Sequence, residues 1–327
     1  MKKTLVAIAA AVATTGAMAE VTISGIIDQA YVRTVASTST TSATTTSVGG
    51  QYTGGDLNIA GSEDLGNGMT AKFQLGFTTE ASSTAATNYG NYVSYLSLSG
   101  GFGSIKVGQF WSPLHITSAT YDAADYSQIN TQHQVSQAAS GAVGTSTGQL
   151  VAGQIQYTLP SLMEGLNIQV GTAQAEATGS SVGNQNNYGL SYSSGPFSVG
   201  YSGSIVETST TTETTNTSSG ASYDLGMAKL FYAVQTRKLS SAAATDQGTQ
   251  FGVQVPLGAL KIGVSSTTYT MASVAANTAG NGYNMLFKYD LSKRTSFIAQ
   301  TGQTKVTSGT TSGAISQTTA VGLLHFF

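Results

Sequence analysis

The sequence predicts an all-β fold, a 16-stranded antiparallel transmembrane β-barrel with long extracellular loops and short periplasmic turns. Three observations predict it: apolar and polar residues alternate with a period of two, short turns alternate with long polar stretches, and the N-terminus has the pattern of an export signal. In lipid every backbone polar group must be paired, so only helices or closed barrels cross a membrane. No stretch after the N-terminus approaches the roughly 20 apolar residues of a helical span.

The N-terminal residues predict export. Lys2 and Lys3 precede an apolar run over residues 5–12, and Ala17-Met18-Ala19 is typical of a cleavage site. We therefore expect residues 1–19 to be a signal peptide that is removed after Ala19, and residues 20–327 to form the mature barrel. An exported chain without helical spans is periplasmic, secreted or an outer-membrane barrel.

The strands follow from the alternation. In residues 70–78, Ala71, Phe73, Leu75 and Phe77 alternate with polar residues or glycine, and residues 154–158, 260–265 and 283–290 repeat the pattern. One apolar face and one polar face suit a wall between lipid and a water-filled lumen. Aromatic residues at the expected strand ends predict a periplasmic girdle of Phe102, Tyr157, Phe197, Tyr223, Tyr289 and Phe327, and an outer girdle of Tyr31, Tyr52, Tyr89, Tyr269 and Tyr283.

The connections set the strand count. Seven short turn signals, such as residues 63–68 and 290–293, alternate with eight longer polar stretches, and together they join sixteen strands. Tracts rich in Thr and Ser at 37–47 and 208–219 fall in the long stretches, where we expect solvated loop tips. Segregated turn lengths and an even strand number are typical of an up-and-down membrane barrel rather than of a soluble sandwich.

The composition excludes several classes of function. Only 9% of the residues are charged, the net charge is −2 and there is no cysteine. Nucleic-acid binding needs a basic surface, and disulfide frameworks and thiol nucleophiles need cysteine. No Ser–His–carboxylate set or nucleophile elbow is recognisable. We therefore expect no enzyme, no catalytic residues, no metal site and no cofactor.

Six segments resemble the trimeric general porins of Gram-negative bacteria, in the betaproteobacterial and neisserial style. They are VTISGIID at 21–28, GSEDLGNGMTA at 61–71, GGFGSIKVGQ at 100–109, YTLPS at 157–161, LSKRT at 291–295 and VGLLHFF at 321–327. The resemblance implies a homotrimer in outer-membrane lipid through which ions and small hydrophilic solutes diffuse passively. It also implies that the barrel assembly machinery reads the C-terminal Phe327, and that the third extracellular loop folds inward.

The chain departs from this family at three positions. Leu324 and Phe326 stand where relatives often have an inward basic residue, and Gln109 stands where they often have Arg. With only three Arg in the chain, we expect a weaker ionic preference than in arginine-rich relatives.

The longest loop, 112–148, is the candidate constriction, and it contains Asp122 and Asp125 but no Lys or Arg. Strand parity assigns six further charges to the lumen side: Asp28, Lys72, Lys106, Lys261, Lys288 and Arg294. Arg294 lies beside a turn and is expected at the periplasmic rim. We predict that Lys72 and Lys106 face the two loop carboxylates and set up a transverse field at the narrow point.

Three alternatives to a general diffusion pore stay open: a substrate-selective channel, a structural or adhesive surface barrel, and a soluble secreted β-protein. Single-channel conductance separates the diffusion pore from an adhesive barrel with a plugged lumen, and a saturable current that the solute blocks distinguishes the substrate-selective channel. Extraction by detergent as heat-modifiable trimers separates all of these from a soluble protein.

Overall fold

The computed structural model describes residues 20–38, 40–50, 52–79, 91–125, 150–174, 183–272 and 278–327. The expected signal peptide, residues 1–19, lies outside this range. Within the described residues, no helix is long and apolar enough to cross a membrane.

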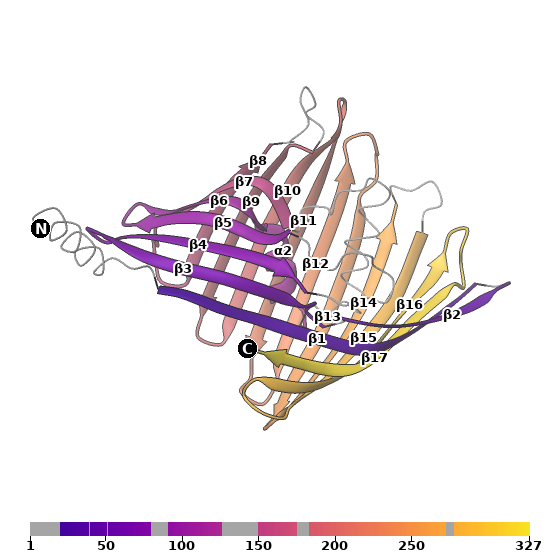
Figure 1. Ribbon diagram of the computed structural model, residues 1–327. Helices are drawn as coiled ribbons and strands as arrows, with labels where there is room; N and C mark the ends of the chain where they lie inside the picture. The colour runs from indigo at the N-terminus through magenta and orange to yellow at the C-terminus, as the bar shows by residue number, and fades with distance from the viewer. Residues whose placement is uncertain are drawn as a thin grey trace, which may run out of the picture.

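A closed antiparallel barrel of sixteen strands dominates the structure (Figure 1), which confirms the predicted fold class. The barrel strands are β1 (Glu20–Ser37), β3 (Asp56–Gly66), β4 (Met69–Thr78), β5 (Asn91–Gly100), β6 (Gly103–Trp111), β7 (Leu150–Thr158), β8 (Leu166–Ala173), β9 (Gln185–Ser194), β10 (Phe197–Ser209), β11 (Thr212–Asp224), β12 (Lys229–Leu239), β13 (Asp246–Leu257), β14 (Leu260–Met271), β15 (Thr278–Asp290), β16 (Thr295–Ser308) and β17 (Ile315–Phe326). β1 pairs with both β3 and β17, which closes the ring.

A further strand, β2 (Ser42–Gly49), lies outside the sixteen and pairs with the end of β1 from Ala30 to Ser37. Strand β11 takes up much of the second Thr/Ser tract. The expectation of loop tips is therefore wrong for residues 42–47 and 212–219. Thr is β-branched and favours strands, and facing hydroxyls stabilise the ladder, as between Thr217 and Thr236 at 2.6 Å.

The short turns follow the predicted chemistry. Between β3 and β4 the chain reverses through Gly66, Asn67 and Gly68, whose φ angles are 78°, 52° and 74°. Glycine and asparagine adopt this left-handed region most readily. The Asp64 side chain also accepts a hydrogen bond from the Gly66 amide at 2.8 Å.

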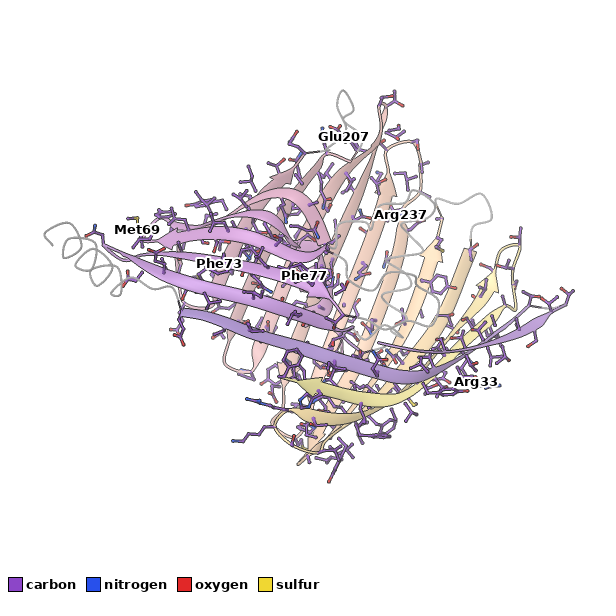
Figure 2. The ribbon with its side chains drawn as sticks, viewed as in Figure 1. Arg33, Met69, Phe73, Phe77, Glu207 and Arg237 are labelled. Atoms are coloured by element: carbon purple, nitrogen blue, oxygen red, sulfur yellow. The ribbon has the colours of Figure 1, made fainter. Side chains whose placement is uncertain are left out.

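The two faces of each strand differ as the alternation predicts. On β12, Phe231, Ala233, Gln235 and Arg237 are buried inside the ring, whereas Tyr232 is 51% exposed on the outside. Figure 2 shows the side chains along the barrel, with Phe73 and Phe77 on β4, the strand whose alternation is clearest in the sequence. The buried residues therefore lie on the inner face of the barrel, where chain that folds into the lumen covers them.

Two girdle assignments are wrong. Tyr52 is 7% exposed and packs inside the ring. Tyr269 packs on Gly280. It lies on the same face of β14 as Gly263, which contacts Ala123 inside the ring, so Tyr269 also faces inward. Tyr89 lies outside the described residues. Proximity to a strand end does not by itself reveal which face an aromatic ring occupies.

The seam between the first and last strands ends in a reciprocal contact. The Gly25 amide donates to the Phe327 carbonyl oxygen and the Phe327 amide donates to the Gly25 carbonyl oxygen, both at 3.1 Å. The Phe327 ring covers Gly25 so closely that a Cβ there would lie 2.4 Å from a ring carbon. A Cβ there would also lie 2.5 Å from the Asp56 carbonyl oxygen, and this backbone atom cannot move aside as a ring can, so position 25 favours glycine.

Candidate functional site

A short helix, α2 (Pro113–Thr120), enters the lumen directly after β6 (Figure 1). The Ser112 side chain caps it by accepting a hydrogen bond from the His115 amide at 3.3 Å, and proline occupies its first turn, where a missing N–H costs nothing. The His115 ring stacks on Trp111, with ring centroids 4.0 Å apart. Residues 112–125 thus lie inside the ring, and residues 126–148 of the expected constriction loop lie outside the described residues.

Wall glycines let this segment approach the barrel closely. The Tyr121 ring lies against Gly220, where a Cβ would sit 2.4 Å from a ring carbon, and its hydroxyl is 3.0 Å from Ser198 Oγ. The Ala123 carbonyl oxygen lies 2.1 Å from where a Cβ on Gly263 would be. Larger residues at these wall positions would push the segment towards the centre of the pore.

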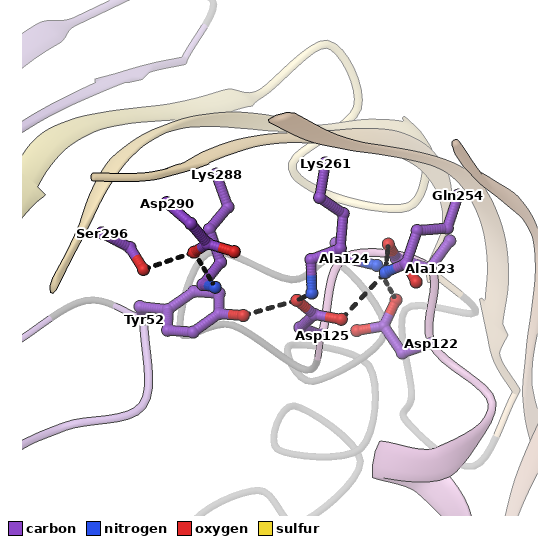
Figure 3. Close-up of polar contacts among 10 residues, drawn as sticks. All are labelled: Tyr52, Asp122, Ala123, Ala124, Asp125, Gln254, Lys261, Lys288, Asp290 and Ser296. Carbon is purple, nitrogen blue, oxygen red and sulfur yellow. Dashed lines mark hydrogen bonds and ion pairs between the residues drawn. The ribbon is translucent and has the colours of Figure 1, made fainter. Parts of the chain in front are cut away.

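Asp125 joins three parts of the molecule (Figure 3). It forms an ion pair with Lys261 of β14, accepts a hydrogen bond from Gln254 of β13 at 2.9 Å, and accepts another from the Tyr52 hydroxyl. Its own backbone has a φ of 55°, an uncommon angle that aspartate tolerates better than most residues. The carboxylate therefore fastens the lumen segment to the wall and to the chain between β2 and β3.

Asp28 holds the chain between β2 and β3 in place. One of its carboxylate oxygens accepts hydrogen bonds from the amides of Tyr52, Thr53 and Gly54 at 2.7, 3.0 and 3.1 Å. Burial and the nearby charge of Asp125 raise the pKa of Tyr52. The phenol therefore stays protonated and acts as the donor to Asp125.

An apolar cluster lies beside this link, on the inner face of the barrel. Leu286, Ile298 and Leu324 point inward from β15, β16 and β17 and pack with Tyr52 and Ala124. Leu286 and Leu324 are fully buried. The apolar residue at 324, where the family often has a basic one, is thus covered by the two inserted pieces of chain, and burial of apolar area helps hold them there.

The prediction that Lys72 and Lys106 face Asp122 and Asp125 across the narrow point stays a prediction. The contacts of the two carboxylates lie on β13, on β14 and within the inserted chain. Asp122 accepts hydrogen bonds from the Gln250 side chain at 2.9 Å and the Ala124 amide at 3.0 Å, and Asp125 pairs with Lys261. Parity reveals the face on which a charge lies, but not the part of the ring that the inserted segment reaches.

Lys72 and Lys106 lie on β4 and β6, in one cross-strand row with Ser97 of β5 between them. At about 4.8 Å per strand, their backbones are roughly 10 Å apart. The Lys106 ammonium lies over the Tyr95 and Phe110 rings, 4.7 and 4.9 Å from their centroids. Lys72 is exposed to the lumen.

The two remaining basic residues of the predicted set lie near the rim. Lys288 pairs with Asp290 at 2.6 Å, and Asp290 also accepts a hydrogen bond from the Ser296 hydroxyl (Figure 3). Arg294 lies in the turn between β15 and β16, as its sequence position indicates.

Sequence reasoning missed the most buried ion pair that the described residues contain. Arg237 donates to one oxygen of Asp246 through Nε at 3.0 Å and Nη2 at 2.8 Å, and the two residues are 7% and 2% exposed. They are cross-strand partners on β12 and β13. The sequence does place these opposite charges on the same face of neighbouring strands. That observation identifies them as partners only when the register of the two strands is known.

Comparisons with known proteins agree with this geometry. The family described as Gram-negative porin matches residues 6–309. The chain is 28% identical to major outer membrane protein P.IB of Neisseria meningitidis serogroup B over 100% of both chains, and 29% identical to outer membrane porin protein 32 of Delftia acidovorans over 90% of this chain and 87% of the relative.

Solved structures give the same fold. An anion-selective porin from Comamonas acidovorans superposes with a TM-score of 0.83 at 22% identity, covering 95% of this chain and all of the other. Salmonella typhi OmpF in complex with daunomycin gives 0.72 at 13% identity over 95% of this chain and all of the other. Family and fold point to a channel rather than an enzyme. The chain belongs to the Gram-negative porin family and is a passive channel of the outer membrane.

Proposed function

We propose that this pore passes ions and small hydrophilic solutes with a modest preference for anions, and that Lys72 and Lys106 carry the preference. One observation supports this: within the described residues neither ammonium has a carboxylate partner, whereas Lys261 and Lys288 are both paired. The other charges of the predicted set hold inserted chain, are neutralised by a partner or lie at the rim. They are Asp28, Asp122, Asp125, Lys261, Lys288 and Arg294.

The physical basis is field focusing. A low-dielectric wall concentrates the field of unpaired charges into the water-filled lumen, so two ammonium groups in one row raise the local concentration of anions. The structural relative from Comamonas acidovorans is described as anion-selective. With two lysines instead of a ladder of arginines, the preference here is modest.

The test is the reversal potential of a planar bilayer in a KCl gradient. The double variant Lys72→Gln with Lys106→Gln shifts the reversal potential towards cations relative to the unaltered chain. Lys238→Gln is the matched control, because Lys238 lies on the outer face of β12 and is exposed. An unchanged reversal potential in the double variant contradicts the assignment.

The assembled form that we propose is a homotrimer in outer-membrane lipid, delivered by a signal peptide cleaved after Ala19 and inserted by the barrel assembly machinery through Phe327. A solved relative, OmpT of Vibrio cholerae, is described in a trimer form. Intact mass of the purified chain tests the start at Glu20, and cross-linking in detergent tests the trimer.

An adhesive or structural barrel is the main alternative, favoured only by the Thr/Ser-rich strands that reach the outer rim. Such a barrel with a blocked lumen shows no single-channel conductance, which the same bilayer experiment measures.

A further inference from the structure

A recess lies behind the lumen segment, between α2 and the inward faces of β8, β9 and β10. Its cavity volume is about 130 Å³. A single water molecule needs only about 10–15 Å³ of such volume, so the recess has room for a small solute. It lies on a different part of the wall from Lys72 and Lys106, which are on β4 and β6.

Every polar side chain that lines the recess is uncharged. The wall contributes the amides of Asn167 and Gln169 and the hydroxyl of Ser191, and α2 contributes the hydroxyl of Thr117. Among the described residues, neither amide has a side-chain hydrogen-bond partner. Each amide offers two donors and a carbonyl acceptor, so a ligand with several hydroxyl groups finds both kinds of partner here.

The α2 side of the recess also offers apolar surface beside the hydroxyls of Thr117 and Thr120. Pro113 and Ile116 face it from α2, and the Tyr121 ring closes one end. Apolar surface opposite unpaired amides matches the two faces of a sugar ring or a similar polyol, which has C–H groups on one side and hydroxyls around its edge. An anion finds no cation in the lining, and a purely apolar ligand leaves the amides unpaired at a cost.

The recess is also preorganised. Tyr121 is fixed by its contact with Gly220 and by its hydrogen bond with Ser198, and Ser118 of α2 donates to Ser218 of the wall at 3.1 Å. Because α2 does not need to be ordered on binding, little conformational entropy is lost.

We propose that this recess is a binding site for neutral polyhydroxylated solutes of monosaccharide size. The inference rests on the proposed channel function and names a solute class for it. Binding is weak and brief, as a channel requires, since a solute that binds tightly cannot leave.

The test is a titration of single-channel current with D-glucose in concentrated KCl, with the current corrected for bulk conductivity. Glucose reduces the corrected current saturably in the unaltered chain. A poly(ethylene glycol) of similar size, which lacks the ring of hydroxyls, is the probe for simple volume exclusion and gives no saturation.

The double variant Asn167→Leu with Gln169→Leu keeps side-chain size and removes both amides, so the glucose effect becomes at least about tenfold weaker. The control is Asn58→Leu with Gln74→Leu, which removes another inward pair, linked at 2.7 Å on β3 and β4, and leaves the glucose effect unchanged.

Three outcomes overturn the site: equal glucose block in both double variants, equal block by the polymer, or normal KCl conductance with no saturable glucose effect in the unaltered chain. Absence of KCl conductance overturns the channel function itself and the site with it. Saturation-transfer NMR of glucose on the unaltered protein in detergent does not depend on the folding of a variant, and a missing signal there also rejects the site.

Discussion

Asp125 shows how one side chain sets both shape and charge in this pore. Its carboxylate holds two inserted pieces of chain and neutralises Lys261, yet the two side chains of the ion pair remain 24% and 30% exposed. Ion pairs with that much exposure contribute up to about 1 kcal/mol to stability. The larger consequence of the pair is electrical, because it removes one positive charge from the lumen.

The first prediction concerns that charge. Asp125→Asn leaves an acceptor for Tyr52 and Gln254 but removes the counter-charge of Lys261, so the reversal potential in a KCl gradient moves towards anions. Combining it with Lys261→Gln returns the potential close to that of the unaltered chain. A shift in the opposite direction, or one that survives the second substitution, contradicts the pairing.

The sequence indicates the face of a strand on which a charge lies, but not the partner of that charge. Parity indicated which charges face inward, because the side-chain period of a strand is fixed at two residues. It did not indicate that Asp125 pairs with Lys261, since Lys261 is 136 positions away and nothing local records where the inserted segment touches the ring. Arg237 and Asp246 were missed for the same reason, because their pairing depends on register.

At the scale of elements, the contact between the lumen segment and the glycine-containing wall determines the open cross-section. The wall offers hollows at Gly220 and Gly263, and the segment fills them with Tyr121 and the Ala123–Ala124 backbone. Because closely packed surfaces resist both gaps and extra volume, these filled hollows keep the inserted segment in one position against the wall.

The second prediction fills one hollow. Gly220→Ala forces the Tyr121 ring away from the wall, costs about 1–3 kcal/mol, and produces unstable single-channel currents in place of one level. Gly101→Ala is the control, because a Cβ there meets nothing within 4 Å. Adding Tyr121→Ser to Gly220→Ala restores a single level. A steady current in Gly220→Ala alone excludes this contact as the determinant.

The strands themselves were predictable wherever a strand separates lipid from water. Residues 70–78 form β4 nearly as the alternation indicates. The Thr/Ser tracts lack this contrast, since both faces are polar, and they were mistaken for loops although β2 and β11 run through them. Their strands form because backbone ladders continue from neighbours that are already in place.

At the scale of the whole molecule, closure of the ring depends on its two end strands. The register joins Ile26 to Phe326, and Phe327 adds two backbone hydrogen bonds and an aromatic contact at Gly25.

The third prediction tests that seam. Deletion of Phe327 removes two hydrogen bonds, worth about 0.5–1.5 kcal/mol each, and uncovers Gly25. The folded form, which migrates as a compact species on unheated gels, then converts to the unfolded form at a lower temperature. Phe102→Ala is the control, because Phe102 is 40% exposed in the turn between β5 and β6. An identical conversion temperature for both variants shows that the seam does not need its last residue.

The seam also governs when the protein becomes a pore. Its partners are 326 − 26 = 300 positions apart in the chain, so β1 is among the first strands that the ribosome makes and it waits for the last one. Contacts between such distant residues form late in folding. A chain whose synthesis stops early has an open ring with unpaired edges, which lipid does not tolerate. The topology therefore acts as a check on completeness: a fragment cannot perforate the membrane, and only a finished chain conducts.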